Sequence, residues 1–358
     1  MVIPEIFIKF LFYVLRRPKW RDSFYAFYGD HLQSVGQLEI YEFLNIGALC
    51  KKFPKRVKVT DTGYIFNNVV VMEDGIIAFD KKTFFVSDRY VLYTIIRRLS
   101  SLRRAVPKVK LATGFLMCGN YSSSFNFFHF LTDSLAPNFN PKITSSQFPI
   151  LVPVICNNFQ SEVLDKLNIT NYLEVDSAIE VENLSLNLRE SKWNRDVYKR
   201  ARSALGVSDK SAKSSKKIIY STRLGRARNY KNEDKLIKFL KSYDVEVVDF
   251  AAISLDERIT LLNQTSILIG QYGAGLTNLV FLPAGGYVID LQTVNVHRND
   301  YCLLANACGV GYINVPFHDR FFSNQRSYTL VDDDFYHIKV AVGFIMAAQE
   351  SDLTGECC

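Results

Sequence analysis

A run of apolar residues ends in a glycine-rich turn at residues 267–278, which read Ile-Leu-Ile-Gly-Gln-Tyr-Gly-Ala-Gly-Leu-Thr-Asn. This pattern predicts a buried strand, a tight turn and the first residues of a helix. Glycines let a ligand come close to the backbone, and the amino end of a helix presents unpaired N–H groups with a partial positive charge. The turn therefore predicts an anion site, with phosphate as the first candidate. A turn that only solves a backbone problem is the alternative.

The order of the glycines differs from that of two well-known phosphate-binding motifs. A P-loop would end in Gly-Lys-Ser or Gly-Lys-Thr, and neither follows this turn. The dinucleotide fingerprint reads G-x-G-x-x-G in a first βα unit, whereas the order from Gly270 to Gly275 is G-x-x-G-x-G, late in the chain.

A group of positive charges follows the strand predicted at 217–221. Arg223, Arg226 and Arg228 lie close together in this segment. Guanidinium groups bind phosphate oxygens with two parallel hydrogen bonds. Since the segment follows a strand in the same half of the chain as the glycine turn, we interpret it as part of the same anion site. A solvated basic loop is the alternative.

Residues 126–137 contain a candidate general base. Asn126, His129 and Asp133 have the spacing i, i+3 and i+7, which on a helix forms one stripe. A carboxylate can orient an imidazole and stabilise its charged form, and an imidazole titrates near physiological pH. Either His129 or Asp133 could be the base. The alternative is a buried His–Asp pair at a domain face.

The second half of the chain alternates predicted strands and helices. Strands are expected at 217–221, at 245–249, before the glycine turn and at 287–291, and helices at 233–241 and, from the capping box Ser254–Glu257, through Leu262. This alternation predicts an α/β fold with a parallel sheet, whose ligands bind at the carboxyl ends of the strands.

The first half of the chain gives weaker signals. Residues 67–79 predict a hairpin with its turn at 73–75. Residues 148–156 predict a short strand, and Pro149 and Pro153 favour the edge of a sheet for it.

Length, composition and charge favour a two-domain globular protein that meets anions. The chain has 358 residues, of which 48% are hydrophobic and 22% charged, and its net charge is +7. Its basic residues are scattered in pairs, which favours an anionic membrane face or substrate over nucleic acid. Its seven cysteines lack C-x-x-C spacing, which favours a reducing, cytoplasmic compartment over a disulfide framework or zinc site.

The amino terminus predicts contact with a membrane surface. Residues 2–15 are strongly apolar, and residues 16–21 (Arg-Arg-Pro-Lys-Trp-Arg) are basic. The apolar run is shorter than the roughly 20 residues that cross a bilayer. We interpret it as an interfacial helix with its basic end on anionic head groups. A core helix of the first domain is the alternative.

Four segments together resemble glycosyltransferase family 61. They are Asn-Phe-Phe-His-Phe-Leu-Thr-Asp at 126–133, Ser221-Thr222-Arg223 through Arg228 to Asn232-Glu233, Gly273-Ala274-Gly275-Leu276-Thr277-Asn278, and Val288-Ile289-Asp290-Leu291. The resemblance spans residues 126 to 291, with the segments in the family's order and spacing. Two positions depart from the family's pattern: Tyr272 stands where it usually has His, and Asp290 where it usually has Glu.

The resemblance implies a GT-B enzyme, with two Rossmann-like domains facing a cleft and a C-terminal helix. The expected parts are a membrane-proximal amphipathic segment (1–25), an N-terminal acceptor-side domain (26–210), a nucleotide-sugar-binding domain (217–325) and a C-terminal helix and tail (326–358). The enzyme would invert the anomeric carbon without a metal-binding Asp-x-Asp, and we expect the aspartates at 332–334 to cap a helix instead. It would need no cofactor.

The resemblance also implies roles for single residues. The diphosphate of a nucleotide sugar, UDP-linked in known members, would meet Arg223 and Arg228, and the catalytic pair His129 and Asp133 would face the acceptor. Phosphate and ribose would meet the donor residues of the last two segments, which are Tyr272, Gly273, Ala274, Gly275, Thr277, Asn278 and Asp290.

The leading hypothesis is a cytoplasmic, membrane-associated glycosyltransferase of surface polysaccharide synthesis, because bacterial relatives often make capsular polysaccharide. Its partners would be a nucleotide sugar, a glycan or lipid-linked acceptor and an anionic membrane surface, with no nucleic acid. A nucleotide-sugar epimerase of similar build and a non-catalytic membrane-bound scaffold are the alternatives.

Overall fold

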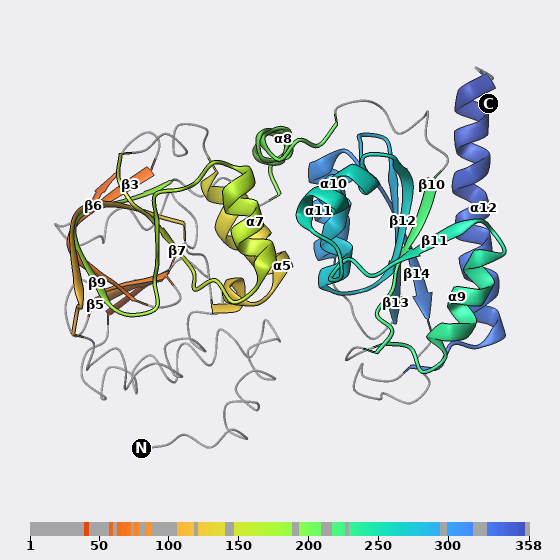
Figure 1. The fold of residues 1–358 in the computed structure, drawn as a ribbon, viewed down its shortest axis with the longest axis horizontal. Coiled ribbons are helices and arrows are strands. Elements are labelled where there is room, and N and C mark those ends of the chain that lie inside the picture. Colours follow the sequence, from red (N-terminus) through yellow and green to blue (C-terminus); the bar gives the residue numbers. More distant parts are fainter. Residues whose placement is uncertain are drawn as a thin grey trace.

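The computed structural model describes residues 39–42, 57–59, 63–72, 75–78, 83–86, 106–117, 121–139, 147–187, 193–208, 217–225, 229–293, 299–317 and 328–354. These residues form two units, each built around one sheet (Figure 1). We call residues 39–187 the N-terminal unit and residues 217–354 the C-terminal unit, and the helix α8 (Arg195–Ala204) lies between them in the sequence. The apolar and basic segment at 2–21 and residues 209–216, at the expected boundary between the two domains, lie outside the described residues.

The sheet of the N-terminal unit is mixed. Its order is β1-β5-β4-β3-β9-β6-β7-β8, and β2 also pairs with β3. The strands are β1 (Glu39–Glu42), β2 (Val57–Val59), β3 (Gly63–Met72), β4 (Ile76–Ala78), β5 (Thr83–Val86), β6 (Val109–Leu116), β7 (Ile150–Val152), β8 (Tyr172–Glu174) and β9 (Ile179–Asn187). The predicted hairpin is confirmed, since β3 and β4 pair antiparallel. A connection this short cannot carry a parallel crossover, so this sheet departs from the mostly parallel Rossmann pattern.

The prediction that β7 lies at a sheet edge was wrong. The strand pairs parallel with β6 on one side and with β8 on the other. Pro149 and Pro153 lie just outside its two ends, so neither ring removes an N–H group from the ladder.

The helices that the structure describes in the N-terminal unit are short. They are η2 (Tyr121–Ser124), α5 (Phe127–His129), the π-helix η3 (Phe130–Leu135), η4 (Ala136–Asn138) and α7 (Asn158–Lys166). In Figure 1, α5 and α7 lie between the two sheets, on the side that faces the C-terminal unit.

The C-terminal unit contains a parallel sheet in the order β11-β10-β12-β13-β14, as the alternation of strands and helices predicted. Its strands are β10 (Lys217–Ser221), β11 (Val245–Val248), β12 (Thr265–Gln271), β13 (Tyr287–Thr293) and β14 (Gly311–Phe317). Every residue of β12 is buried, as expected for a central strand that is covered on both faces.

Helices cover both faces of this sheet. Leu236 of α9 (Glu233–Lys241) and Ile338 of α12 (Asp332–Thr354) belong to the core of one face. Ile259 of α10 (Leu255–Leu262), Leu304 of α11 (Asp300–Cys308) and Leu279 of the 3₁₀ helix η6 (Ala274–Phe281) belong to the core of the other. The aspartates at 332–334 form the first turn of α12. Their negative charges interact favourably with the partial positive charge at the amino end of the helix.

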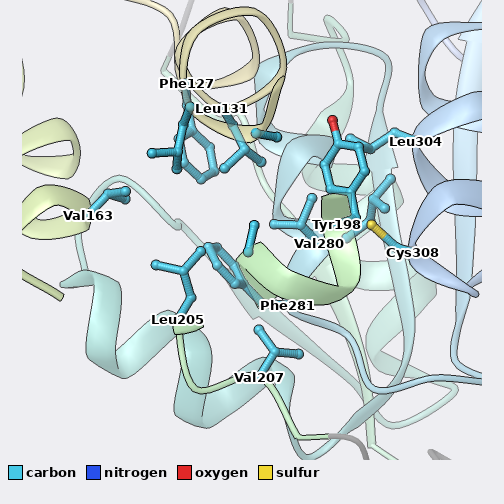
Figure 2. Close-up of a cluster of buried hydrophobic side chains, with 14 of the residues drawn as sticks. Phe127, Leu131, Val163, Tyr198, Leu205, Val207, Val280, Phe281, Leu304 and Cys308 are labelled. Atoms are coloured by element: carbon cyan, nitrogen blue, oxygen red, sulfur yellow. The ribbon is translucent and has the colours of Figure 1, made fainter. Parts of the chain in front are cut away.

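One apolar cluster joins the two units. Phe127 and Leu131 of the N-terminal unit share it with Phe281 and Leu304 of the C-terminal unit (Figure 2). The rings of Phe127 and Phe281 stack with their centroids 6.2 Å apart. Arg202 of α8 donates to the carbonyls of Val280 and Leu282 at the end of η6, at 3.0 and 2.8 Å. The parts that carry the two groups of predicted site residues are therefore packed together.

Among the described residues, none of the helices is both long and apolar enough to cross a membrane.

Candidate functional site

The arginine segment and the glycine turn meet at the topological switch point of the parallel sheet. If its five strands are numbered by their order in the chain, their order across the sheet is 2-1-3-4-5. The direction of this order reverses between β10 and β12. Ligands of doubly wound α/β sheets bind outside the carboxyl ends of the two strands at this point. Arg223 follows the end of β10, and Gly273 follows the end of β12.

Arg223 lies directly on the glycine turn. Its Nη1 donates to the carbonyl oxygen of Tyr272 at 3.4 Å. Gly273 has φ 149°, and a Cβ added there would collide with Nη1 of Arg223. Glycine is therefore needed at this position for two reasons, the backbone conformation and the close approach of a guanidinium.

The helix that follows the glycine turn is a 3₁₀ helix rather than the α-helix expected for a βα unit. Gly273 precedes η6, and its carbonyl accepts the N–H of Leu276 at 2.9 Å. Gly275 lies against Ser221, since a Cβ on Gly275 would stand 3.0 Å from the Ser221 hydroxyl oxygen. The end of β10 and the start of η6 are thus in contact at the switch point.

Several polar groups of the predicted donor site are buried next to this turn. Thr277, Asn278 and Asp290 are 0%, 2% and 0% exposed. Asp290 Oδ2 accepts from the Tyr312 hydroxyl at 2.8 Å. Within the described part of the chain, Asp290 Oδ1 and Asn278 Oδ1 are buried atoms without a hydrogen-bond partner. A buried polar atom left without a partner costs about 1–3 kcal/mol, which a ligand hydroxyl could recover.

Burial raises the pKa of Asp290 from 3.8 to about 7, although the hydrogen bond from Tyr312 opposes the shift. Because the folded protein then holds this proton more tightly than the unfolded chain does, the carboxyl group favours folding at low pH. This contribution is lost as the pH rises from about 4 through about 7.

We therefore expect the change in the free energy of unfolding caused by Asp290→Asn, relative to the wild-type protein, to be more favourable at pH 8 than at pH 4.5 by about 3 kcal/mol. The asparagine cannot ionise, so it escapes the cost of a buried charge at high pH. Urea unfolding at both pH values measures this difference, and Asp234→Asn on the exposed face of α9 is the control. An equal effect of Asp290→Asn at both values contradicts the account.

Tyr272 is held on α11. Its hydroxyl donates to Asp300 Oδ2 at 3.2 Å, and its N–H donates to the carbonyl of Leu291 at 3.2 Å. The tyrosine that stands in the place of the family's histidine is therefore fixed by a carboxylate at the start of the next helix.

His129 and Asp133 form a close pair in the N-terminal unit. His129 Nδ1 and Asp133 Oδ2 are 2.6 Å apart, and their side chains are 21% and 6% exposed. Thr132 donates to the other oxygen, Oδ1 of Asp133, at 3.2 Å. The carboxylate is thus buried and held, while the imidazole keeps some access to solvent, as a group that transfers protons requires.

The predicted helical stripe exists only in part. Asn126 does not lie on the helix but caps it, because its Oδ1 accepts the N–H groups of Phe128 and His129 at 3.0 and 3.4 Å. After His129 the helix widens into the π-helix η3. Such turns are rare and frequently occur at functional sites. A stripe at i, i+3 and i+7 requires a regular α-helix, and this segment departs from one after His129.

Tyr301 of α11 connects the His129 segment to the glycine turn. Its ring makes edge contacts with Phe128 and with Tyr272, both at a centroid distance of 5.2 Å. Phe128 directly precedes the predicted base His129, and Tyr272 is itself a predicted donor residue and directly precedes Gly273. No sequence pattern points to Tyr301, because only the packing of α11 brings it between the two motifs.

Two further points concern the predicted site. Arg226 and Arg228 lie outside the described residues, so the structure does not locate Arg228. In the part of the chain that the structure describes, no group of three or more His, Cys, Asp or Glu side chains is arranged to hold a metal ion.

The sequence model of the family named Glycosyltransferase 61 matches residues 127–289. The match covers somewhat less than half of the chain, so this part of the chain resembles glycosyltransferase family 61. The match begins just before His129 and ends just before Asp290, so it includes the His–Asp pair, the arginine segment and the glycine turn.

Curated relatives match shorter segments of this chain. The EGF domain-specific O-linked N-acetylglucosamine transferase of Drosophila melanogaster is 35% identical over 99 residues, which are 27% of this chain and 19% of the relative. The proteins of the same name from Mus musculus and Rattus norvegicus are 33% and 30% identical over 115 and 132 residues, 30% and 35% of this chain and 22% and 24% of theirs. The matched segments span about a fifth to a quarter of these relatives. The resemblance to glycosyltransferase 61 agrees with the four sequence motifs, and these relatives are named as transferases.

Proposed function

We propose that this protein transfers a sugar from a nucleotide sugar, UDP-linked, to a glycan or lipid-linked acceptor, with inversion and without a metal. The observation that carries the proposal is the contact of Arg223 with the glycine turn at the switch point of the parallel sheet. A leaving diphosphate must be neutralised by fixed positive groups. The guanidinium of Arg223 and the N–H groups at the start of η6 are such groups.

Two hydrogen-bonding groups would hold the rest of the donor in this proposal. Asp290 Oδ1 and Asn278 Oδ1 are buried acceptors next to the turn, and no described residue donates to them. Ribose hydroxyls are donors of the kind that they lack. The donor arrangement would then be that of a GT-B enzyme, with the parallel sheet of the C-terminal unit as its nucleotide-binding domain.

The chemical step in this proposal uses the pair His129–Asp133. The acceptor hydroxyl attacks the anomeric carbon from the face opposite the diphosphate, one member of the pair takes its proton, and the carbon–oxygen bond to the diphosphate breaks. Inversion follows from this single displacement. The shared packing of both motifs on Tyr301 supports the proposal that base and donor act on one substrate pair.

The donor and acceptor are proposals of different strength. The relatives are named for the transfer of N-acetylglucosamine, so UDP-N-acetylglucosamine is the first donor to test. We retain as acceptor a saccharide of a surface polysaccharide, as in the capsular branch of the family, made at the cytoplasmic face of an anionic membrane. The relatives are named for EGF domains, so a folded EGF domain is the second acceptor to test.

Removal of the Arg223 side chain tests the donor site. Charge-assisted hydrogen bonds contribute about 1.5–3 kcal/mol each, so Arg223→Ala should weaken UDP binding roughly tenfold or more. Isothermal titration calorimetry in EDTA measures the affinity. The control is Arg200→Ala, which removes an exposed arginine from α8. If Arg223→Ala binds UDP with the same affinity as the wild-type protein, the proposal is wrong.

A further inference from the structure

Glu233 is a buried carboxylate that the proposed chemistry does not use. It is the first residue of α9 and is 1% exposed. A buried charge needs several hydrogen bonds to offset its loss of water. Oε1 of Glu233 accepts three, from the Tyr220 hydroxyl at 2.8 Å, the Thr222 hydroxyl at 2.9 Å and the Arg223 N–H at 2.8 Å.

All three donors belong to the carboxyl end of β10 or to the residues directly after it. Tyr220 lies within the strand, and Thr222 and Arg223 follow its end. Burial and the charge of Glu233 raise the pKa of Tyr220 well above its usual range, so its hydroxyl keeps the proton that it donates. One carboxylate oxygen therefore fixes the path of the chain as it leaves the sheet toward the glycine turn.

The neighbours of Glu233 extend this network on both sides. Gln271, the last residue of β12, donates to the Tyr220 hydroxyl at 3.4 Å. The Thr222 hydroxyl oxygen accepts the N–H of Leu224 at 3.1 Å. Asn232 exchanges two side-chain hydrogen bonds with the backbone of Leu330, both at 2.9 Å, which anchors the start of α9. The carboxylate of Glu233 is thus carried by the anchored start of α9 and binds the Thr222–Arg223 segment.

We propose that Glu233 is a positioning residue for the nucleotide-sugar donor, because it holds the backbone of Arg223 so that the guanidinium lies on the glycine turn. The inference rests on the proposed function, since it assigns Glu233 to the donor site by way of Arg223. The side chain of Glu233 does not itself contact the phosphates in this proposal. Its effect on binding therefore depends on Arg223 being present.

The hydrogen bonds of the Glu233 side chain are concentrated on one of its two oxygens. Oε2 of Glu233 is buried and, among the described residues, has no hydrogen-bond partner, although Oε1 has three. The concentration of bonds on the Thr222–Arg223 segment matches a role in orienting that segment.

The test compares Glu233→Gln in the full chain with two ligands, UDP and uridine. The glutamine keeps the shape of the side chain but replaces charged hydrogen bonds by neutral ones, which are about half as strong. We expect UDP affinity to fall roughly tenfold. Uridine affinity, measured by ligand-observed NMR, should not change because uridine carries no phosphate. Glu257→Gln is the matched control, since Glu257 lies at an exposed position in the capping box of α10, the helix that follows α9 in the sequence.

A double-mutant cycle decides between positioning and general stability. In the Arg223→Ala background, Glu233→Gln should lower UDP affinity no further. Two results would show that Glu233 only stabilises the unit. One is that Glu233→Gln lowers the affinities for UDP and uridine equally. The other is that the effects of Glu233→Gln and Arg223→Ala on UDP affinity are additive. Unchanged UDP affinity of Glu233→Gln would overturn the inference too, while the effect of Arg223→Ala would still stand for the proposed function. Absence of UDP binding by the wild-type protein would overturn both.

A milder pair of variants serves if Glu233→Gln does not fold. Thr222→Val removes one hydroxyl that donates to Glu233, whereas Thr222→Ser keeps it. We expect weaker UDP binding in Thr222→Val and near-normal binding in Thr222→Ser, with uridine affinity equal in both. The same UDP affinity in the two variants contradicts the inference.

Discussion

His129→Ala and Asp133→Asn are each expected to lower the rate of sugar transfer by roughly 10²–10⁴-fold, the usual effect of removing a general base. Affinity for UDP should stay unchanged in both variants, because the two side chains belong to the N-terminal unit and the donor groups to the C-terminal unit. The close contact of His129 Nδ1 with Asp133 Oδ2, at 2.6 Å, implies that the pair acts together. The two losses should therefore be far from additive in the double variant.

Release of UDP from the nucleotide sugar in the presence of acceptor measures these rates. His337→Ala is the control, because His337 lies on the exposed face of α12. It should transfer at the wild-type rate. Near-normal transfer by both His129→Ala and Asp133→Asn would show that the pair is structural and that the base lies elsewhere.

Gly273→Ala is expected to weaken UDP binding by roughly tenfold or more, the scale of one or two charge-assisted hydrogen bonds. The new methyl group would collide with Nη1 of Arg223 and would stand on a backbone with φ 149°. It would thus displace the guanidinium and distort the turn at the same time.

Gly309→Ala separates these two effects. Gly309 also has a positive φ, 69°, but a Cβ there would meet no atom within 4 Å. The control should lose some stability to urea and keep its UDP affinity. If Gly273→Ala binds UDP as the wild-type protein does, the contact of Arg223 with the turn has no part in donor binding.

The sequence predicted the C-terminal unit better than the N-terminal unit, for a physical reason. The strands of the C-terminal unit are apolar runs followed by polar turns, and the capping box at Ser254 and Glu257 marks the start of α10. In this unit the local sequence pattern therefore agrees with the fold. The N-terminal sheet depends on pairings between distant segments, such as Asn67 with Asn183. Nothing local encodes such a pairing, so the mixed order and the interior place of β7 could not be predicted.

The same distinction applies to the site. The residue types and the order of the motifs were enough to predict that Arg223 and the glycine turn meet, because strand ends of a parallel sheet share one edge. Tyr301 and Glu233 act through packing and burial, which the sequence does not display. Tyr301 links two motifs 144 residues apart (129 and 273) by contact with their neighbours. Glu233 is the last residue of the second motif, and the sequence suggests no role for it.

The structure of the protein with UDP, determined from crystals grown in EDTA, tests the central claim most directly. The account predicts that the diphosphate lies within hydrogen-bond distance of the Arg223 guanidinium and of backbone N–H groups in residues 273–275, with a ribose hydroxyl on Asp290. A diphosphate bound away from the ends of β10 and β12, or UDP bound only when a divalent cation is added, would contradict it.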